Sequence, residues 1–182
     1  GPGIGSVSEE DAEAIRLILE TGTPTVLDAD GLNLAAAMQW NLGEHVLATP
    51  HHGEIRRLLP DADNYAIRAD IADCFLAEHE AALIYKGART IVTQRGKPLF
   101  YNITGDPGMA TAGQGDVLAG ICGGFISRGE SLLVSAVLGV YLCGRASEMA
   151  ISAGEATQQT LTAGDTLRHL PSAILSTARL CY

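Results

Sequence analysis

The sequence predicts an α/β domain with a largely parallel sheet and some antiparallel strands. Short β-rich runs alternate with helical stretches through the first half, which is the pattern of strand–helix–strand units. From about residue 114 onwards the patterns are helical only. The 182 residues suffice for one sizeable core, and no internal repeat, low-complexity tract or linker divides them. We therefore expect one domain over residues 1–182.

In the first half, each expected strand is a short β-rich run, and the turn-forming pairs Gly87-Ala88 and Gly96-Lys97 separate the later runs. The expected helices carry apolar residues at helical spacing. The elements expected in order are a strand at 25–28, a helix at 32–40, a strand ending at Thr49, a helical turn or two at 54–59, a helix at 64–80, and strands within 81–86, 89–94 and 98–102.

Three helices are expected in the last part of the chain. The first starts near residue 114 or 115 and runs to about residue 128, where Gly129 stops it. The second spans about 131–152, with apolar residues repeating on one face. Thr162 is a good N-cap for the third, and Pro171 is expected to divide that helix by starting a new turn.

The composition is that of an acidic soluble protein. The chain is 47% hydrophobic and 18% charged, with a formal net charge of -9. This balance argues against nucleic acid and against an anionic membrane surface as main partners. The most apolar segment, at 134–143, is too short to cross a bilayer, and no signal peptide is visible. A cytoplasmic location is therefore expected.

The four cysteines are predicted to be reduced thiols. Cys74, Cys122, Cys143 and Cys181 show no CxxC spacing and mostly fall within apolar helical patterns. Such a distribution favours buried thiols in a reducing compartment over a disulfide framework or a zinc site.

One stretch carries the chemistry, PGMATAGQGDVLAG at 107–120, with four glycines and a single charged side chain, Asp116. The glycine loop AGQG at 112–115 leads into a helix, so its backbone N–H groups and the helix dipole form an anion site. Asp116 falls in the first helical turn. It serves either as a base that takes a proton from a hydroxyl during phosphoryl transfer or as a simple helix cap.

Six ordered motifs and the N-terminal GPGIG resemble the nucleotide-dependent NAD(P)H-hydrate dehydratases, a branch of the ribokinase-like superfamily. TGDPGMATAGQGDVLAG is similar to that family's TGNPGMATGGSGDVLAG. The other motifs follow in the family's order: VLDADGLN (26–33), TPHHGEIRRLL (49–59), IYKGARTIV (84–92), LGVYLCGRASEMA (138–150) and LTAGDTLRHLPSAI (161–174). The resemblance implies a ribokinase-like three-layer sandwich with a mostly parallel central sheet.

The resemblance also implies an activity. The family dehydrates NADHX and NADPHX, the hydrated nicotinamide cofactors, at the expense of ADP or ATP and usually with Mg²⁺. Asp116 would be the catalytic base at the substrate hydroxyl, and Gly3 and His51 would contact the hydrated dinucleotide. The nucleotide would be bound by Lys86, Gly87, Ala88, Arg89, Thr90, Gly113 and Gly115. A homo-oligomer is expected.

Metal ligands are not expected on the protein itself. His51 and His52 are neighbours, and adjacent side chains in extended backbone point to opposite faces, so they do not share one ion. Asp28 and Asp30 remain candidates either for duties linked to magnesium or for a plain turn.

The chain departs from the family's pattern at several positions. Gln114 replaces a small residue, and its bulk is expected beside the phosphate path. Asp106 stands for asparagine, where it either weakens polyphosphate binding or meets magnesium. Ala112 and His52 also differ from the usual glycine and proline.

The chain begins directly with GPGIG, a turn that a doubly wound sheet normally places after a strand. Either Gly1-Pro2 is a remnant of protease cleavage, or the family's N-terminal strands are absent. Two further functions stay open: a ribokinase-like kinase for a small alcohol such as a vitamin precursor, and an inactive domain that binds adenine nucleotide.

Overall fold

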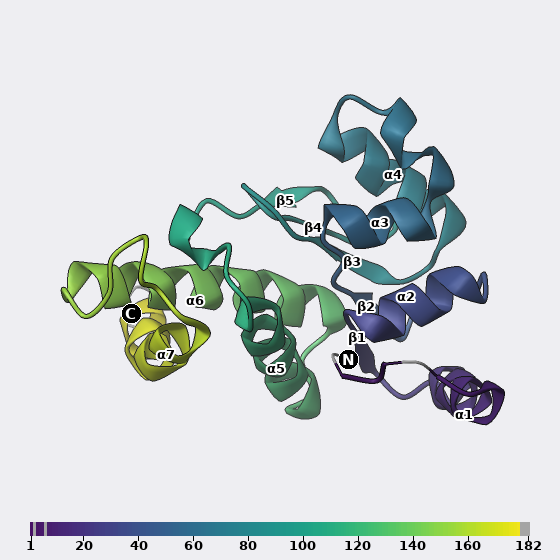
Figure 1. The fold of residues 1–182 in the computed structure, drawn as a ribbon, viewed down its shortest axis with the longest axis horizontal. Coiled ribbons are helices and arrows are strands. Elements are labelled where there is room, and N and C mark those ends of the chain that lie inside the picture. The colour runs from purple at the N-terminus through teal and green to yellow at the C-terminus, as the bar shows by residue number, and fades with distance from the viewer. Residues whose placement is uncertain (2, 6, 179–182) are drawn as a thin grey trace.

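Five short strands form one open sheet in the order β1-β2-β3-β4-β5 (Figure 1). The computed structural model describes residues 1, 3–5 and 7–178. β1 pairs with β2 and β2 with β3 in parallel, whereas β4 is antiparallel to both β3 and β5. β4 alone therefore runs against the other strands, and the predicted mostly parallel sheet is confirmed. The strands are β1 Thr25–Leu27, β2 Val46–Ala48, β3 Ala82–Tyr85, β4 Ile91–Thr93 and β5 Phe100–Tyr101.

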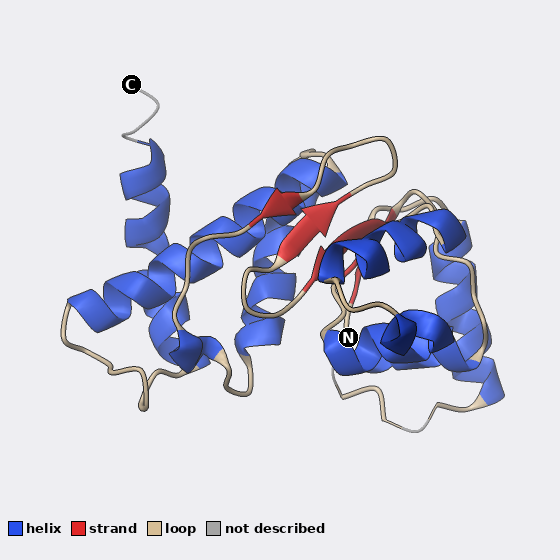
Figure 2. Ribbon diagram, turned by 90° about the horizontal axis from the view of Figure 1, so that it is seen from above, coloured by secondary structure: helices blue, strands red, loops and turns tan. Residues whose placement is uncertain are grey.

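Helices cover both faces of this sheet, which makes three layers. α2, α3 and α4 lie on one side, and α5 and α6 lie on the other, with α7 packed against α5 and α6 (Figures 1 and 2). The helices are α1 Glu9–Glu20, α2 Asp30–Ala37, α3 His52–Leu58, α4 Arg68–Glu78, α5 Gln114–Ser127, α6 Leu132–Ser152 and α7 Ala163–Ala178, with short 3-10 turns η1 Pro60–Asn64 and η2 Pro107–Met109.

The core follows from strand alternation, because successive side chains point to opposite faces. In β2, Val46 and Ala48 join the cluster under α2, α3 and α4, while Leu47 joins the cluster under α5 and α6. In β3, Leu83 and Ile84 divide in the same way. A sheet buried on both faces needs apolar residues at every position, which explains why the strands read as continuous hydrophobic runs.

The prediction for Pro171 was wrong, because α7 continues through it as one helix. Pro171 and Leu167, whose carbonyl would accept the missing hydrogen bond, are exposed, so water can satisfy that carbonyl. On the opposite face Thr166 and Ala173 are buried. Packing of that face keeps the parts of α7 before and after Pro171 in one continuous helix.

Sequence reasoning also missed α1 and misplaced some helix ends. Ser8 and Asp11 form a capping box at the start of α1, and this S-x-x-D pattern was the available signal. The expected helix at 64–80 begins only at Arg68, after the η1 turn, and α2 begins at Asp30 instead of residue 32.

Among the described residues, α6 is the one helix long and apolar enough to cross a membrane, with 21 residues and a mean hydropathy of 1.3. However, 56% of an apolar 18-residue stretch of α6 is buried within the protein. α6 packs against α5, α7 and strands β2 to β4, so its apolar character is that of a core helix. Its length exceeds the ten-residue segment considered from the sequence.

The cysteines within the described residues are free thiols. Cys122 and Cys143 are buried between α5 and α6, whereas Cys74 is half-buried. Burial raises the pKa of Cys122 to about 12 and that of Cys143 to about 11. The predicted buried thiols are thus confirmed for these two, while Cys181 lies outside the described residues.

Candidate active site

Three residues that directly follow the parallel strands meet at the carboxyl end of the sheet. Asp28 follows β1, Thr49 follows β2 and Lys86 follows β3. Asp28 Oδ1 accepts hydrogen bonds from Thr49 Oγ1 and from Lys86 Nζ, both at 2.7 Å. Open α/β sheets bind their ligands at this edge. The strand ends therefore predict where a site should lie, and the structure places a charged cluster there.

Glu54, from α3, adds a second buried carboxylate to this edge. It is 5% exposed, and its Oε2 lies 3.7 Å from Lys86 Nζ. We call Asp28, Thr49, Glu54 and Lys86 the strand-end cluster. Its two carboxylates share one ammonium group, so the cluster keeps a negative charge, and Lys86 is a paired cation. Sequence reasoning did not single out Glu54 or Thr49, although both lie in the TPHHGE motif.

His51 connects to this cluster through a reciprocal helix cap. Its backbone N–H donates to Glu54 Oε2 at 2.8 Å, and its Nδ1 accepts from the Glu54 N–H at 3.2 Å. Its Nε2 lies 3.4 Å from Glu54 Oε1, but the imidazole is 55% exposed, so part of the ring is accessible to a ligand. The neighbouring His52 turns elsewhere, toward Tyr85, as expected for side chains that do not share an ion.

The start of α5 lies directly above the strand-end cluster. Gly113 is its N-cap, in the left-handed conformation with φ +86° and without a side-chain cap. A Cβ on Gly115 would lie 3.5 Å from both Asp28 Oδ2 and Lys86 Nζ. The first turn of a 14-residue helix therefore lies against this charged edge, and its N-cap residue makes no side-chain hydrogen bond to the free N–H groups.

Asp116 occupies the first turn of α5 with its side chain exposed. Among the described residues, no side-chain hydrogen bond or ion pair is made by this carboxylate. Asp116 therefore makes no capping hydrogen bond, and the alternative of a purely structural role rests on its charge in the first turn of the helix. The arrangement leaves an accessible carboxylate next to a helix N-terminus without a side-chain cap.

The turn from Lys86 to Thr90, here called the nucleotide turn, joins β3 to β4 at the same edge. Thr90 Oγ1 donates to the Gly87 carbonyl at 3.1 Å, and Arg89 has a positive φ of +55°. Ala88 and Arg89 are exposed. The structure thus brings this turn and the start of α5 together around Lys86.

Gly3 is placed near this edge less directly. The Gly5 N–H donates to Asp30 Oδ2 at 3.1 Å, which attaches the N-terminal glycine turn to the start of α2, immediately after β1. Gly3 itself is exposed, with φ +80°. Ala29, between the two aspartates, also has a positive φ of +50°, which is uncommon for a residue other than glycine.

The Gln114 side chain is buried in the interior, whereas its bulk was expected beside the phosphate path. Its side chain is directed inward and the residue is 7% exposed, with Nε2 donating to Thr166 Oγ1 at 2.9 Å. Thr166 in turn bonds Ser147 of α6 at 2.8 Å. Asp106 is also engaged locally, because it accepts from the Gly108 N–H at 2.7 Å and caps η2.

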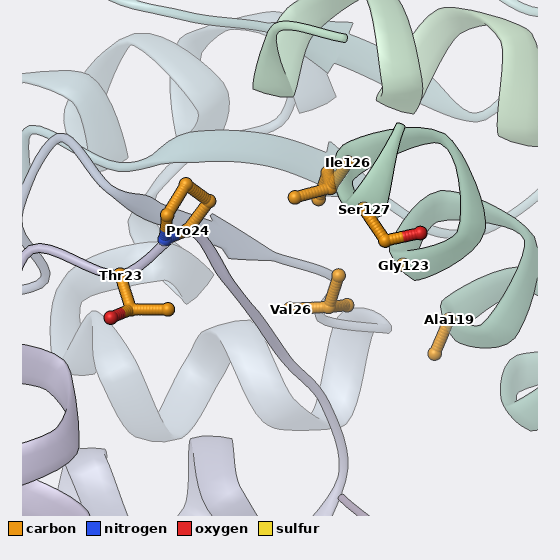
Figure 3. Close-up of a pocket in the computed structure, with 7 residues that line it drawn as sticks. All are labelled: Thr23, Pro24, Val26, Ala119, Gly123, Ile126 and Ser127. Atoms are coloured by element: carbon orange, nitrogen blue, oxygen red, sulfur yellow. The ribbon is translucent and has the colours of Figure 1, made fainter. Parts of the chain in front are cut away.

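Within the described residues, no group of three or more His, Cys, Asp or Glu side chains is arranged to hold a metal ion. A cavity of about 420 Å³ lies between β1 and α5, away from the strand-end cluster (Figure 3). It is lined by Thr23, Pro24, Val26, Ala119, Gly123, Ile126 and Ser127. None of these is an expected site residue, and the lining carries no charge.

The sequence profile of the NAD(P)H-hydrate dehydratase family matches residues 1–170. The chain belongs to this family. It is 40% identical over 180 residues to the bifunctional NAD(P)H-hydrate repair enzyme Nnr of Moorella thermoacetica, covering 94% of this chain and 33% of that protein. The enzyme of the same name from Coxiella burnetii is 36% identical over 176 residues, covering 93% and 34%.

Solved structures show the same fold. The ADP/ATP-dependent NAD(P)H-hydrate dehydratase of Bacillus subtilis, co-crystallized with ATP/Mg²⁺, superposes with a TM-score of 0.79 at 25% identity, covering 93% of this chain and 60% of that one. A ribokinase-like superfamily protein of Enterococcus faecalis gives 0.79 at 24% identity, covering 97% and 61%. The predicted ribokinase-like fold is confirmed. The chain spans about a third of the length of the Moorella thermoacetica and Coxiella burnetii repair enzymes.

Proposed function

We propose that this chain carries out the dehydration of NADHX and NADPHX to NADH and NADPH, using ADP or ATP with Mg²⁺. The observation that carries the proposal is the exposed Asp116 at the uncapped start of α5, directly above the strand-end cluster. Family membership and the Bacillus subtilis dehydratase, co-crystallized with ATP/Mg²⁺, support it.

The proposed reaction replaces a poor leaving group with a better one. Asp116 takes the proton from the substrate hydroxyl, whose oxygen then bonds the terminal phosphorus of the nucleotide while the bond to the bridging oxygen breaks. The N–H groups around Gly113 and Gly115 stabilise the negative charge on the phosphoryl group in transit. Loss of phosphate and of the ring proton beside it then restores the conjugated nicotinamide ring.

The remaining site residues have binding roles in this proposal. His51, with an open imidazole face, and Gly3 contact the dinucleotide, and the nucleotide turn with Lys86, Gly87, Ala88, Arg89 and Thr90 binds the adenine nucleotide. The carboxylates of Asp28 and Glu54 fit Mg²⁺ through its waters, because Mg²⁺ favours oxygen ligands and the cluster keeps a negative charge. When bound, the ion would neutralise charge on the polyphosphate.

The test is to incubate the purified chain with NADHX and either ADP or ATP. Recovery of NADH absorbance is expected. A stable phosphorylated product without NADH would instead support the small-alcohol kinase. Thermal stabilisation by ADP or ATP without any turnover would support the inactive adenine-nucleotide-binding domain.

The cytoplasmic location and the homo-oligomer remain part of the proposal. The location rests on the free, buried thiols Cys122 and Cys143, which suit a reducing compartment. Light scattering on the purified chain tests the oligomer, and a monomeric mass would contradict it.

A further inference from the structure

Arg68 begins α4 at a place where a cation is unfavourable. The N-terminus of a helix carries partial positive charge, so an arginine in the first turn costs free energy unless other groups offset it. The N-cap residue, Ile67, offers no side-chain hydrogen bond to the free N–H groups. The partners of the Arg68 guanidinium must therefore account for its position.

Those partners are the carbonyl groups of the nucleotide turn and its flank. Nη1 donates to Ala88 O at 2.7 Å and reaches Arg89 O at 3.4 Å. Nη2 donates to Tyr85 O at 2.8 Å and to Lys86 O at 3.1 Å. The planar fork of an arginine can satisfy several acceptors at once, which an ammonium group cannot do in the same geometry.

This pattern fixes which side of the turn carries hydrogen-bond donors. Because a peptide group is planar and trans, the N–H of each following residue points away from the carbonyl before it. With the carbonyls of Ala88 and Arg89 turned to Arg68, the N–H groups of Arg89 and Thr90 face the opposite side. Arg68 thus directs the carbonyl acceptors of the turn toward itself and leaves N–H donors on the opposite side, as binding of an anionic nucleotide requires.

The same contacts hold an unfavourable backbone in place. Arg89 has φ +55°, a conformation that residues other than glycine rarely adopt. Gly87 has φ +149°, and a Cβ there would lie 3.1 Å from Arg68 Nη2, so this position favours glycine. The turn and the arginine therefore fit each other as a pair.

Tyr85 supports the guanidinium from below. The Arg68 guanidinium carbon lies 4.2 Å from the centre of the Tyr85 ring, which is fully buried. The Tyr85 hydroxyl and His52 Nδ1 are 2.7 Å apart and share a hydrogen bond. His52 is one of the departures from the family pattern, and here it anchors the ring to the start of α3, beside His51.

We propose that Arg68 is the positioning residue of the nucleotide turn, supported by Tyr85 and His52. It acts through the turn's backbone and does not touch the reacting atoms. This inference rests on the proposed function, because it assumes that the turn binds an adenine nucleotide. It adds a residue that lies outside the motifs on which the family resemblance is based.

The test compares Arg68→Lys with Arg95→Lys. Arg95 is a matched control, because it also donates to carbonyls, those of Leu76 and His79 at the other end of α4, away from the turn. For Arg68→Lys, calorimetry should show ADP affinity weakened by at least about tenfold, since hydrogen bonds from a charged group are lost. The KM for the nucleotide should rise while the KM for NADHX stays unchanged. Arg95→Lys should keep wild-type ADP affinity.

Tyr85→Phe is the second variant, which keeps the ring and removes only the bond to His52. A roughly two- to fivefold loss of ADP affinity is expected, smaller than for Arg68→Lys. Unchanged ADP affinity in Arg68→Lys would overturn the inference, as would an equal loss in Arg95→Lys. If Arg68→Lys does not fold, wild-type affinity in Tyr85→Phe decides against it. ADP binding that weakens as expected, in a chain that never dehydrates NADHX, would contradict the proposed function alone.

Discussion

The glycine loop and the nucleotide turn both present backbone to the proposed nucleotide, but they are held by different means. The loop is continued by α5, whose first turn needs only Gly113 in a left-handed conformation and no capping side chain. The turn has no helix behind it, and Arg68 holds its carbonyls from another element. A helix supplies oriented donors by itself, whereas a turn between strands needs an external side chain to orient them.

The largest effect is expected at Asp116, the one acid of the glycine loop region. Asp116→Asn should reduce turnover by about 10²- to 10⁴-fold, as for loss of a positioned base, while ADP affinity stays close to wild type. Steady-state kinetics on NADHX and calorimetry with ADP measure the two quantities.

Asp70→Asn is the matched control, because Asp70 holds the same third position of α4 that Asp116 holds in α5. It removes the same interaction with a helix dipole without touching the site. Comparable turnover losses in both variants would assign the effect to the helix and remove Asp116 from the mechanism.

Gly113→Ala should break the loop half of the comparison. The residue needs φ +86°, and a Cβ would lie 3.0 Å from that of Ala163. We expect a loss of roughly 1–3 kcal/mol in the free energy of unfolding, with weaker ADP binding as the start of α5 shifts. In Gly120→Ala, whose Cβ would meet nothing within 4 Å, stability should be kept or raised. Equal denaturation midpoints for the two variants would contradict this account.

Thr90→Val separates the turn's own contacts from those of Arg68. It removes the hydroxyl that donates to the Gly87 carbonyl at 3.1 Å and accepts from the Gly87 N–H at 3.4 Å, while it keeps the shape of the side chain. ADP affinity should fall by roughly two- to tenfold, because the lost hydrogen bonds are between neutral groups. If calorimetry shows a larger loss of ADP affinity in Thr90→Val than in Arg68→Lys, the hydrogen bonds within the turn contribute more to its conformation than those from Arg68.

The smallest effect on binding is expected at Gln114. Gln114→Ser should lower the free energy of unfolding by about 1–2 kcal/mol, because the buried contact with Thr166 is lost. ADP affinity should not change, since the side chain points into the interior. If calorimetry shows a changed ADP affinity, Gln114 does contribute to nucleotide binding.

The parts of this site that sequence predicts are those that depend on neighbours along the chain. Asp116 and Gly113 belong to one loop that opens a helix, and Lys86 directly follows a strand. Arg68 and Glu54 gain their roles only when α4 and α3 fold back over the strand ends, and no local pattern specifies that contact. The direction of the Gln114 side chain likewise depends on a partner 52 residues away.

The fold was predictable to a similar extent, and for the same reason. Continuous apolar runs identified the strands because the sheet is buried on both faces. Pro171 was misjudged because local rules oppose proline within a helix, while packing of Thr166 and Ala173 decides the outcome. Packing outweighs the low helix propensity of a single residue where one face of the helix is buried along its whole length.

The two buried thiols allow opening of the contact between α5 and α6 to be measured by thiol modification. With pKa values raised to about 12 and about 11, Cys122 and Cys143 are almost entirely protonated near neutral pH, and an alkylating reagent cannot reach them in the folded protein. They react only when the helices separate, so the rate of their modification measures how often this interface opens. Among the cysteines that the structure describes, the half-buried Cys74 reacts before these two and serves as the comparison in the same sample.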